Sequence, residues 1–219
     1  MRITLSFDNG PEPEVTPRVL DTLRAHGLPA IFFVIASKLA ADRRPLAQRA
    51  KDEGHLIGNH TFTHTLSLGA FEEPAQAARR EILDAQQILG DLSDPRRLFR
   101  PRGSSGGVLD DRLLSVEAIE LLRSGGFTLV LWNLVPGDWL RPQDWVAPAL
   151  DGAASREHSL LVLHDLPTGA MERLDAFIEA ARAAGAEFSQ ELPADCTPIV
   201  RGEVVGDLAP YHRARPREG

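Results

Sequence analysis

Short apolar runs alternate with amphipathic segments along most of this 219-residue chain, and this alternation limits the possible folds more than any other feature. The runs that predict strands are Ile3–Phe7, Ile31–Ile35, His55–Asn59, Leu98–Arg100, Thr128–Trp132 and Leu160–His164. Several of them are continuously apolar, as expected of strands that are buried on both faces. The segments with helical spacing are Glu14–His26, Leu39–Glu53, Pro74–Leu89, Asp111–Ser124 and Ala170–Ala184. Strand–helix alternation of this kind is typical of a parallel α/β sheet or barrel.

The length and composition favour one globular domain over residues 1–219. Hydrophobic residues make up 43% of the chain and charged residues 25%, which excludes a disordered or fibrous protein. From about Leu192 the sequence is rich in proline and its periodicity is weak. We therefore expect residues 192–219 to form a C-terminal arm that packs over the barrel and frays through 213–219.

The net charge and the lack of targeting signals limit the expected binding partners and cellular location. The net charge of −7 argues against nucleic acid or an anionic membrane as the main partner. No apolar stretch has the length of a signal peptide or of a membrane helix, so the sequence predicts a soluble cytoplasmic protein. The single cysteine, Cys196, cannot form an internal disulfide and lacks the flanking residues of known catalytic cysteines.

Polar residues of catalytic type follow five of the predicted strands. In parallel α/β folds the functional site lies at the C-terminal ends of the strands. The segments found there are Asp8-Asn9-Gly10-Pro11, His60-Thr61-Phe62-Thr63-His64, Arg100-Pro101-Arg102-Gly103, Gly137-Asp138-Trp139 and His164-Asp165. Their convergence on one edge of the sheet predicts an active site there.

Each of these signals has a structural alternative when it is taken alone. His60 and His64 are four residues apart, which on a helical turn places both rings on one face, as in many metal sites; they could equally be surface or capping histidines. Asp8 could cap a turn, and His164 could be a hydrogen-bonded core histidine. Arg100 and Asp138 could serve ordinary structural roles.

Taken together, the five segments resemble the motifs of the polysaccharide deacetylases, also called the NodB-homology domain or carbohydrate esterase family four. The first motif, T-F-D-D-G-P, corresponds to Ser6-Phe7-Asp8-Asn9-Gly10-Pro11, and the second, H-[ST]-x-x-H, is intact over residues 60–64. The third, R-x-P-Y, is degraded to Arg100-Pro101-Arg102-Gly103, and the fourth keeps only Asp138-Trp139. The fifth, L-x-L-H, is intact as Leu161-Val162-Leu163-His164.

The resemblance implies a deformed (β/α) barrel that removes acetyl groups from N-acetylated or O-acetylated sugars or oligosaccharides. It implies that Asp8 is the general base, oriented by Arg100, and that His164 is the general acid, oriented by Asp138. It places a divalent metal, usually zinc, at position 9 and the histidines of the second motif. It also implies substrate contacts from Gly103, Trp139 and Leu161. It gives no expectation for the oligomeric state or for the particular sugar.

Asn9 is the main departure from the family, because the metal-binding aspartate stands at that position. An amide oxygen can coordinate a hard cation but brings no charge. Asn9, His60 and His64 could therefore hold the metal more weakly in an enzyme that is still active. Two alternatives remain open: a metal-independent hydrolase of other C–N bonds, of the allantoinase type, or a non-catalytic protein that binds carbohydrate.

Overall fold

A curled sheet forms the centre of the fold, and its first six strands run parallel. The computed structural model describes residues 1–213, and its sheet has the strand order β6-β1-β2-β3-β4-β5-β8-β9, with β7 also paired to β1. The strands are β1 (Arg2–Asp8), β2 (Ile31–Val34), β3 (Leu56–Asn59), β4 (Leu98–Phe99), β5 (Thr128–Leu129), β6 (His158–His164), β7 (Glu187–Ser189), β8 (Ile199–Val200) and β9 (Glu203–Val204). This is the parallel α/β barrel that the sequence predicts, in a deformed and incompletely closed form.

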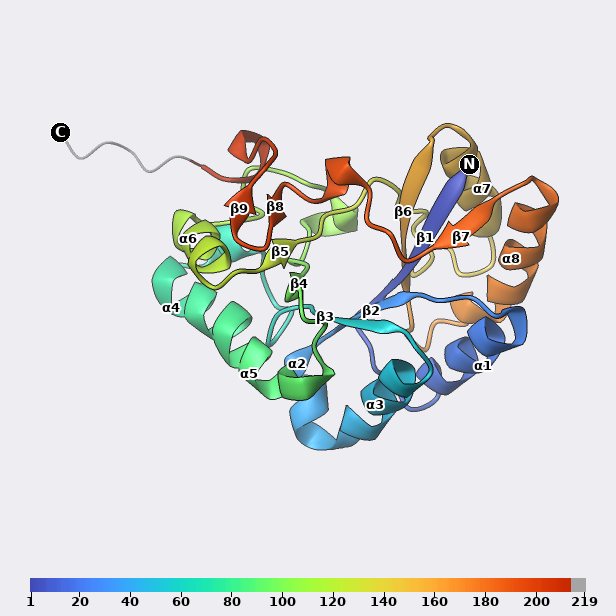
Figure 1. The fold of residues 1–219 in the computed structure, drawn as a ribbon, viewed down its shortest axis with the longest axis horizontal. Coiled ribbons are helices and arrows are strands. Elements are labelled where there is room, and N and C mark those ends of the chain that lie inside the picture. Colours follow the sequence, from blue (N-terminus) through green and yellow to red (C-terminus); the bar gives the residue numbers. More distant parts are fainter. Residues whose placement is uncertain (214–219) are drawn as a thin grey trace.

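Helices cover the outside of this sheet, as Figure 1 shows. They are α1 (Thr16–His26), α2 (Ala36–Lys38), α3 (Arg44–Asp52), α4 (Pro74–Ala78), α5 (Ala85–Leu89), α6 (Val116–Ser124), α7 (Val146–Ala154) and α8 (Leu174–Ala183). A π-helical segment, Arg79–Asp84, joins α4 to α5, so the predicted helix Pro74–Leu89 is one continuous helical stretch. The predicted end of α1 is also confirmed, because Gly27 adopts the left-handed conformation (φ +62°) that commonly caps a helix.

The barrel closes unevenly around β1, which has neighbours on both sides. β6 pairs with β1 along its whole length, whereas β7 pairs with its first half and β2 with its last residues. On the opposite side the chain leaves β5 after Leu129 and continues to Leu134, whose carbonyl accepts a hydrogen bond of 3.0 Å from the Val162 N–H of β6. Thr128–Trp132 was predicted as one strand, but only Thr128–Leu129 forms β5, since the Leu131 N–H donates to the Cys196 carbonyl at 2.7 Å and not to β4.

Residues along each strand alternate between the barrel interior and the helix-covered outside. In β1, Ile3, Leu5 and Phe7 belong to the main apolar core beneath the helices. Ser6 and Asp8 alternate with them and face the other way, as a pleated strand requires. Leu161 and Leu163 of β6 likewise join the outer core. The same alternation brings β6 residues 160, 162 and 164 to the interior.

The helix α7 and the short strands β7, β8 and β9 were not predicted, and α2 lies just before the predicted helix Leu39–Glu53. The helix α7 contains Pro148 and Gly152 and has little polar periodicity, so it carries no helical signal. The strands β8 and β9 are two residues each and lie in the segment predicted to be an irregular arm. In fact β8 extends the sheet antiparallel to β5, so this segment is part of the sheet and not only a covering arm. The predicted fraying concerns mostly residues 214–219, which lie outside the described part of the chain.

Two further expectations concern membrane-spanning helices and the cysteine. Within residues 1–213 the longest apolar helices are too short or too polar to cross a bilayer. Cys196 is 1% exposed, and burial raises the pKa of its thiol to about 12, so it is uncharged at neutral pH. The assignment of residues 1–219 to a single domain stays a prediction.

Trp145 anchors α7 and α8 to the barrel. It is fully buried, its ring centroid lies 5.3 Å from that of Phe177 in α8, and its indole N–H donates a 2.9 Å hydrogen bond to the carbonyl of Ala170. We predict that Trp145→Ala lowers the free energy of unfolding by about 3–5 kcal/mol, because the cavity cannot be refilled. Urea denaturation measures this loss.

The matched control is Leu140→Ala, because Leu140 is a large apolar residue that is 66% exposed. It should change the free energy of unfolding by no more than about 0.5 kcal/mol. Equal effects of the two substitutions would contradict the assignment of Trp145 as an anchor.

Candidate active site

A cavity of about 290 Å³ opens at the C-terminal ends of the parallel strands. Its lining includes residues from β1, β6 and the loops after β3 and β4, which are far apart in the sequence. The polar residues that line it are Asp8, Asn9, His60, His64, Arg102, Ser104 and His164. The five predicted strand ends therefore converge, and all but Arg100 and Asp138 of the predicted polar site residues line one cavity.

Strand register places the two predicted acid–base residues side by side. β1 and β6 are parallel, and Asp8 is the register partner of His164 at the ends of the two strands. Because both positions face the barrel interior, both side chains reach the cavity. Asp8 is 4% exposed, so its carboxylate is almost completely buried at the cavity wall.

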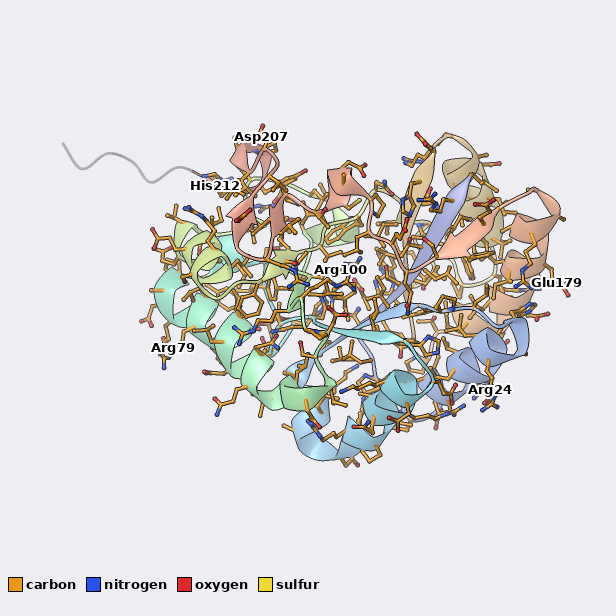
Figure 2. All side chains as sticks on the ribbon, in the orientation of Figure 1. Arg24, Arg79, Arg100, Glu179, Asp207 and His212 are labelled. Carbon is orange, nitrogen blue, oxygen red and sulfur yellow. The ribbon has the colours of Figure 1, made fainter. Side chains whose placement is uncertain are left out.

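Arg100 lies under the cavity and fixes the Asp8 carboxylate. Its Nη1 donates hydrogen bonds of 2.7 Å to Asp8 Oδ1 and 2.9 Å to Ser6 Oγ. The guanidinium is fully buried and lies 3.9 Å from the centroid of the Phe33 ring. Figure 2 shows Arg100 in the middle of the molecule, whereas the labelled Arg24 and Arg79 lie at its edge. One carboxylate oxygen of Asp8 is thus held by Arg100, and the other is left toward the cavity.

His60 and His64 lie on an irregular turn after β3 and not on a helix. Thr61 and His64 have positive φ angles of 67° and 57°, values that residues other than glycine rarely adopt. The two rings nevertheless meet, with centroids 4.6 Å apart. The helical geometry that four-residue spacing suggests is therefore wrong, although the predicted pairing of the two rings is present.

Both rings are neutral at physiological pH and can offer lone pairs. Burial lowers the pKa of His60 to about 3, and burial together with the neighbouring His60 lowers the pKa of His64 to about 2. His60 Nδ1 lies 2.8 Å from the Arg100 carbonyl, which can only accept a hydrogen bond, so Nδ1 carries the proton. His60 Nε2 is then unprotonated, and it lies 3.6 Å from Asp8 Oδ2.

Asn9 lines the same cavity as the two histidines. Its side-chain Oδ1 is buried and has no hydrogen-bond partner among residues 1–213, which is costly for a polar atom. Its carbonyl accepts a 2.6 Å hydrogen bond from Lys38 Nζ. An unsatisfied amide oxygen on a residue that lines the same cavity as two neutral imidazoles fits the donor set of a divalent cation.

The donor set is nevertheless short of carboxylates. Within the described residues, no three His, Cys, Asp or Glu side chains are arranged to hold a metal. A cation in this cavity would therefore need the Asn9 amide oxygen as a ligand in addition to the two imidazoles. The residues fit a divalent metal, but with a neutral set of protein ligands.

His164 is held by Asp138 through two hydrogen bonds. Its Nδ1 lies 2.9 Å from Asp138 Oδ1, and its backbone N–H donates to Oδ2 at 2.9 Å. Burial disfavours the charged ring, but the hydrogen bond and charge of Asp138 outweigh it and raise the pKa of His164 above its ordinary value. Trp139 packs edge-on against His164, with the two ring centroids 4.5 Å apart, and it lines the cavity. His164 is therefore a positioned imidazole that can carry a proton near neutral pH.

Two of the three predicted substrate contacts lie at the cavity. Gly103 and Trp139 line it, whereas Leu161 is fully buried in the outer core, and its neighbour Val162 lines the cavity instead. A Cβ at position 103 would approach Trp132 Cζ2 to 2.8 Å. The Trp132 ring therefore occupies space that a side chain at position 103 would need.

Several lining residues were missed by sequence reasoning or only weakly indicated. These are Arg102, Trp132, Val135, Val162 and Leu166. Strand alternation from His164 could have identified Val162, since residues two apart face the same side. The others lie on loops, where no periodicity reveals which side chains turn inward.

Asp165 packs closely against the turn that carries Asn9. It is fully buried, accepts a hydrogen bond from Thr16 Oγ1, and burial raises its pKa to about 7. A Cβ at position 10 would collide with its carboxyl group, so only glycine allows the Asn9-Gly10 turn to lie this close.

Comparison with known proteins agrees with this geometry. Residues 1–125 match the family model described as polysaccharide deacetylase. The chain belongs to the polysaccharide deacetylase family. It is 35% identical over 164 residues to the chitooligosaccharide deacetylase of Sinorhizobium fredii, and the match covers 74% of this chain and 71% of that protein.

Two solved structures show the same fold. A peptidoglycan N-acetylglucosamine deacetylase in complex with a substituted benzamide is 27% identical, with a TM-score of 0.67 and coverage of 86% of this chain and 85% of that chain. A family 4 acetyl xylan esterase from Clostridium thermocellum in complex with a cobalt ion is 24% identical, with a TM-score of 0.68 and coverage of 86% and 87%. The family, its hydrolase class and the deformed barrel are therefore confirmed.

The Asp138–His164 contact generates a pH prediction. We expect Asp138→Asn to lower the pKa of His164, because the variant loses the hydrogen bond and charge that oppose burial most strongly and keeps only the weaker attraction of Asp8 and Asp165. An NMR pH titration of the His164 ring protons, assigned by their loss in His164→Ala, measures the shift.

The control removes another carboxylate that contacts a histidine. Asp175 Oδ1 lies 2.7 Å from His26 Nε2, in a different part of the structure. Asp175→Asn should leave the pKa of His164 unchanged. An unchanged pKa in Asp138→Asn would show that Asp138 does not control the protonation of His164.

Proposed function

We propose that the chain is a metal-dependent hydrolase that removes acetyl groups from N-acetylated sugars or oligosaccharides. The observation that carries this proposal is the shared cavity of Asp8, His164 and the histidine pair. Asp8 is held by Arg100 and His164 by Asp138, so a base and an acid are each positioned by a buried partner. A pure binding protein has no need of such a pair.

Asn9, His60 and His64 would hold the divalent metal, with zinc as the proposed ion. When bound, zinc supplies Lewis acidity, which polarises an acetyl carbonyl and makes a water molecule easier to deprotonate. The neutral ligands leave the charge of the ion undiminished, as three histidines do in carbonic anhydrase. The same neutrality weakens attraction for the ion, so we expect zinc to bind less tightly than it would with an aspartate at position 9.

The residues of the chain then divide the proton transfers. Asp8, with Oδ1 fixed by Arg100, takes a proton from the attacking water at Oδ2. His164, with Nδ1 fixed by Asp138, gives a proton from Nε2 to the departing amine. The amine is a poor leaving group until it is protonated, so both residues are needed for amide cleavage.

The walls of the cavity would bind the acetylated sugar. The backbone N–H of Gly103 is a candidate donor to the carbonyl oxygen as it gains charge. Trp139, which packs against His164, would form one wall of the pocket for the acetyl group. A chitooligosaccharide deacetylase and a peptidoglycan N-acetylglucosamine deacetylase are among the similar proteins, so their substrate classes are the first to assay.

The missing carboxylate at position 9 favours one competing function, a carbohydrate-binding protein without catalysis. Such a protein would bind acetylated sugars and release no acetate at any zinc concentration. A metal-independent hydrolase of other C–N bonds would instead retain activity after exhaustive chelation. Acetate release measured with and without zinc separates these functions.

Removing the acid or the base tests the proposed roles. We predict that Asp8→Asn and His164→Ala each lower the rate of acetate release by at least ~10²-fold, the usual contribution of a positioned acid or base. Neither residue is a proposed ligand, so zinc content should be retained in both variants. Enzymatic determination of acetate and metal analysis provide the two measurements.

His212→Ala is the control for removing a histidine, since His212 lies at the edge of the molecule in Figure 2. It should keep the wild-type rate. Wild-type activity in either Asp8→Asn or His164→Ala would mean that the residue has been given the wrong role.

Asn9→Asp tests the departure from the family directly. The added negative charge should strengthen zinc binding by about tenfold or more at this partly buried site. Zinc titration of both proteins, followed by acetate release, measures affinity and activity together. Tighter binding with higher activity is the expected result. Unchanged affinity would show that position 9 does not face the metal, and tighter binding without activity on acetylated sugars would contradict the proposed substrate class.

A further inference from the structure

Glu81 is a buried carboxylate that no step of the proposed reaction uses. It is 2% exposed and belongs to the π-helical segment Arg79–Asp84 between α4 and α5. Carboxylates are rarely buried to this extent unless they are paired with a cation or satisfied by hydrogen bonds. Glu81 has no ion-pair partner among the salt bridges formed within residues 1–213. Its charge must therefore be satisfied by hydrogen-bond donors.

The donors all come from the turn between the two cavity histidines. Glu81 Oε2 accepts hydrogen bonds from the backbone N–H groups of Phe62 at 3.0 Å and Thr63 at 2.8 Å. Glu81 Oε1 accepts a third, of 2.9 Å, from Thr63 Oγ1. One carboxylate thus holds the two central residues of the turn.

This turn needs external support because its backbone is strained. Thr61 and His64, on either side of the two held residues, both have positive φ angles. Such conformations persist only where the surroundings fix them. A second tie comes from Asn59, whose Oδ1 accepts from the Thr61 N–H at 2.9 Å and whose Nδ2 donates to the Ile82 carbonyl at 3.0 Å. The helical stretch that contains Glu81 and Ile82 is therefore hydrogen-bonded to the turn and to the strand residue that precedes it.

The position of His64 depends on this shape. His60 is tied independently, because its Nδ1 donates to the carbonyl of Arg100. Within the described residues the His64 ring makes no hydrogen bond, and the His64 backbone N–H donates to Thr61 Oγ1 at 3.0 Å. The distance between the two rings is thus set by the backbone of residues 61–64, which Glu81 holds.

We propose that Glu81 is a positioning residue that sets the spacing of His60 and His64 for binding a divalent cation. This inference rests on the proposed function, because it takes the two histidines as ligands. Glu81 itself does not touch the cation. It acts by accepting hydrogen bonds from Phe62 and Thr63. The length of its side chain, here called its reach, therefore matters more than its charge.

Two conservative variants separate reach from charge. Glu81→Gln keeps the length: its amide oxygen can accept from both backbone N–H groups, and its amide nitrogen can donate to Thr63 Oγ1. That hydroxyl can then turn its own proton to Thr65 Oγ1, 2.9 Å away. Glu81→Asp keeps the charge but withdraws the carboxylate by one methylene, so the bonds to the turn are lost.

Zinc affinity is the measurement, determined by competition with a colorimetric chelator on the full chain. We expect Glu81→Asp to weaken zinc binding about 10–100-fold, the usual effect of losing a residue that orients metal ligands. Glu81→Gln should retain most of the wild-type affinity. The exposed Asp84 lies in the same segment, and Asp84→Ala should bind zinc as the wild type does.

Urea denaturation of each variant separates positioning from general stability. The inference is overturned if Glu81→Asp binds zinc as the wild type does, whatever its stability. It is also overturned if Glu81→Gln is as weak as Glu81→Asp, since keeping the side-chain length would then not keep the zinc affinity. A wild-type chain that takes up no zinc would contradict the proposed function itself, and this inference with it.

Discussion

The buried contact between Arg100 and Asp8 is the interaction on which the rest of the site depends. A fully buried guanidinium is costly unless it is paired and its remaining N–H groups are satisfied. Arg100 meets this condition through Asp8, Ser6 and the Phe33 ring, which come from β1 and β2. Its own carbonyl also accepts from His60. One residue of the β4 end thereby fixes the proposed base through its side chain and a proposed metal ligand through its backbone.

The strand ends were predictable because they follow from strong and local signals. Short apolar runs, several of them continuous, predicted all six parallel strands, and the C-terminal ends of parallel strands meet at one edge of a sheet. Asp8 and His164 therefore reach one cavity as expected. The register that makes them direct neighbours comes from the pairing of β1 with β6, which lie over 150 residues apart and have no sequence signal for their pairing.

The remaining features depend on tertiary contacts that local patterns do not encode. Leu161 was assigned by its place in a motif, but strand alternation turns it to the outer core and brings Val162 to the cavity. The turn from His60 to His64 is non-helical because Glu81 and Asn59 hold it from other elements. The helix α7 follows Trp145, which packs against Phe177 of α8, a contact between segments that no single window of sequence contains.

The proposed zinc site consists of two neutral imidazoles and an amide oxygen in the cavity that also holds the proposed base and acid. X-ray absorption spectroscopy of the zinc-loaded chain reads the atoms around the ion directly. We expect two imidazole nitrogens at about 2.0–2.1 Å, with oxygen atoms completing the coordination and no sulfur. A spectrum without histidine ligands, or one that is unchanged in a His60→Ala and His64→Ala double variant, would contradict it.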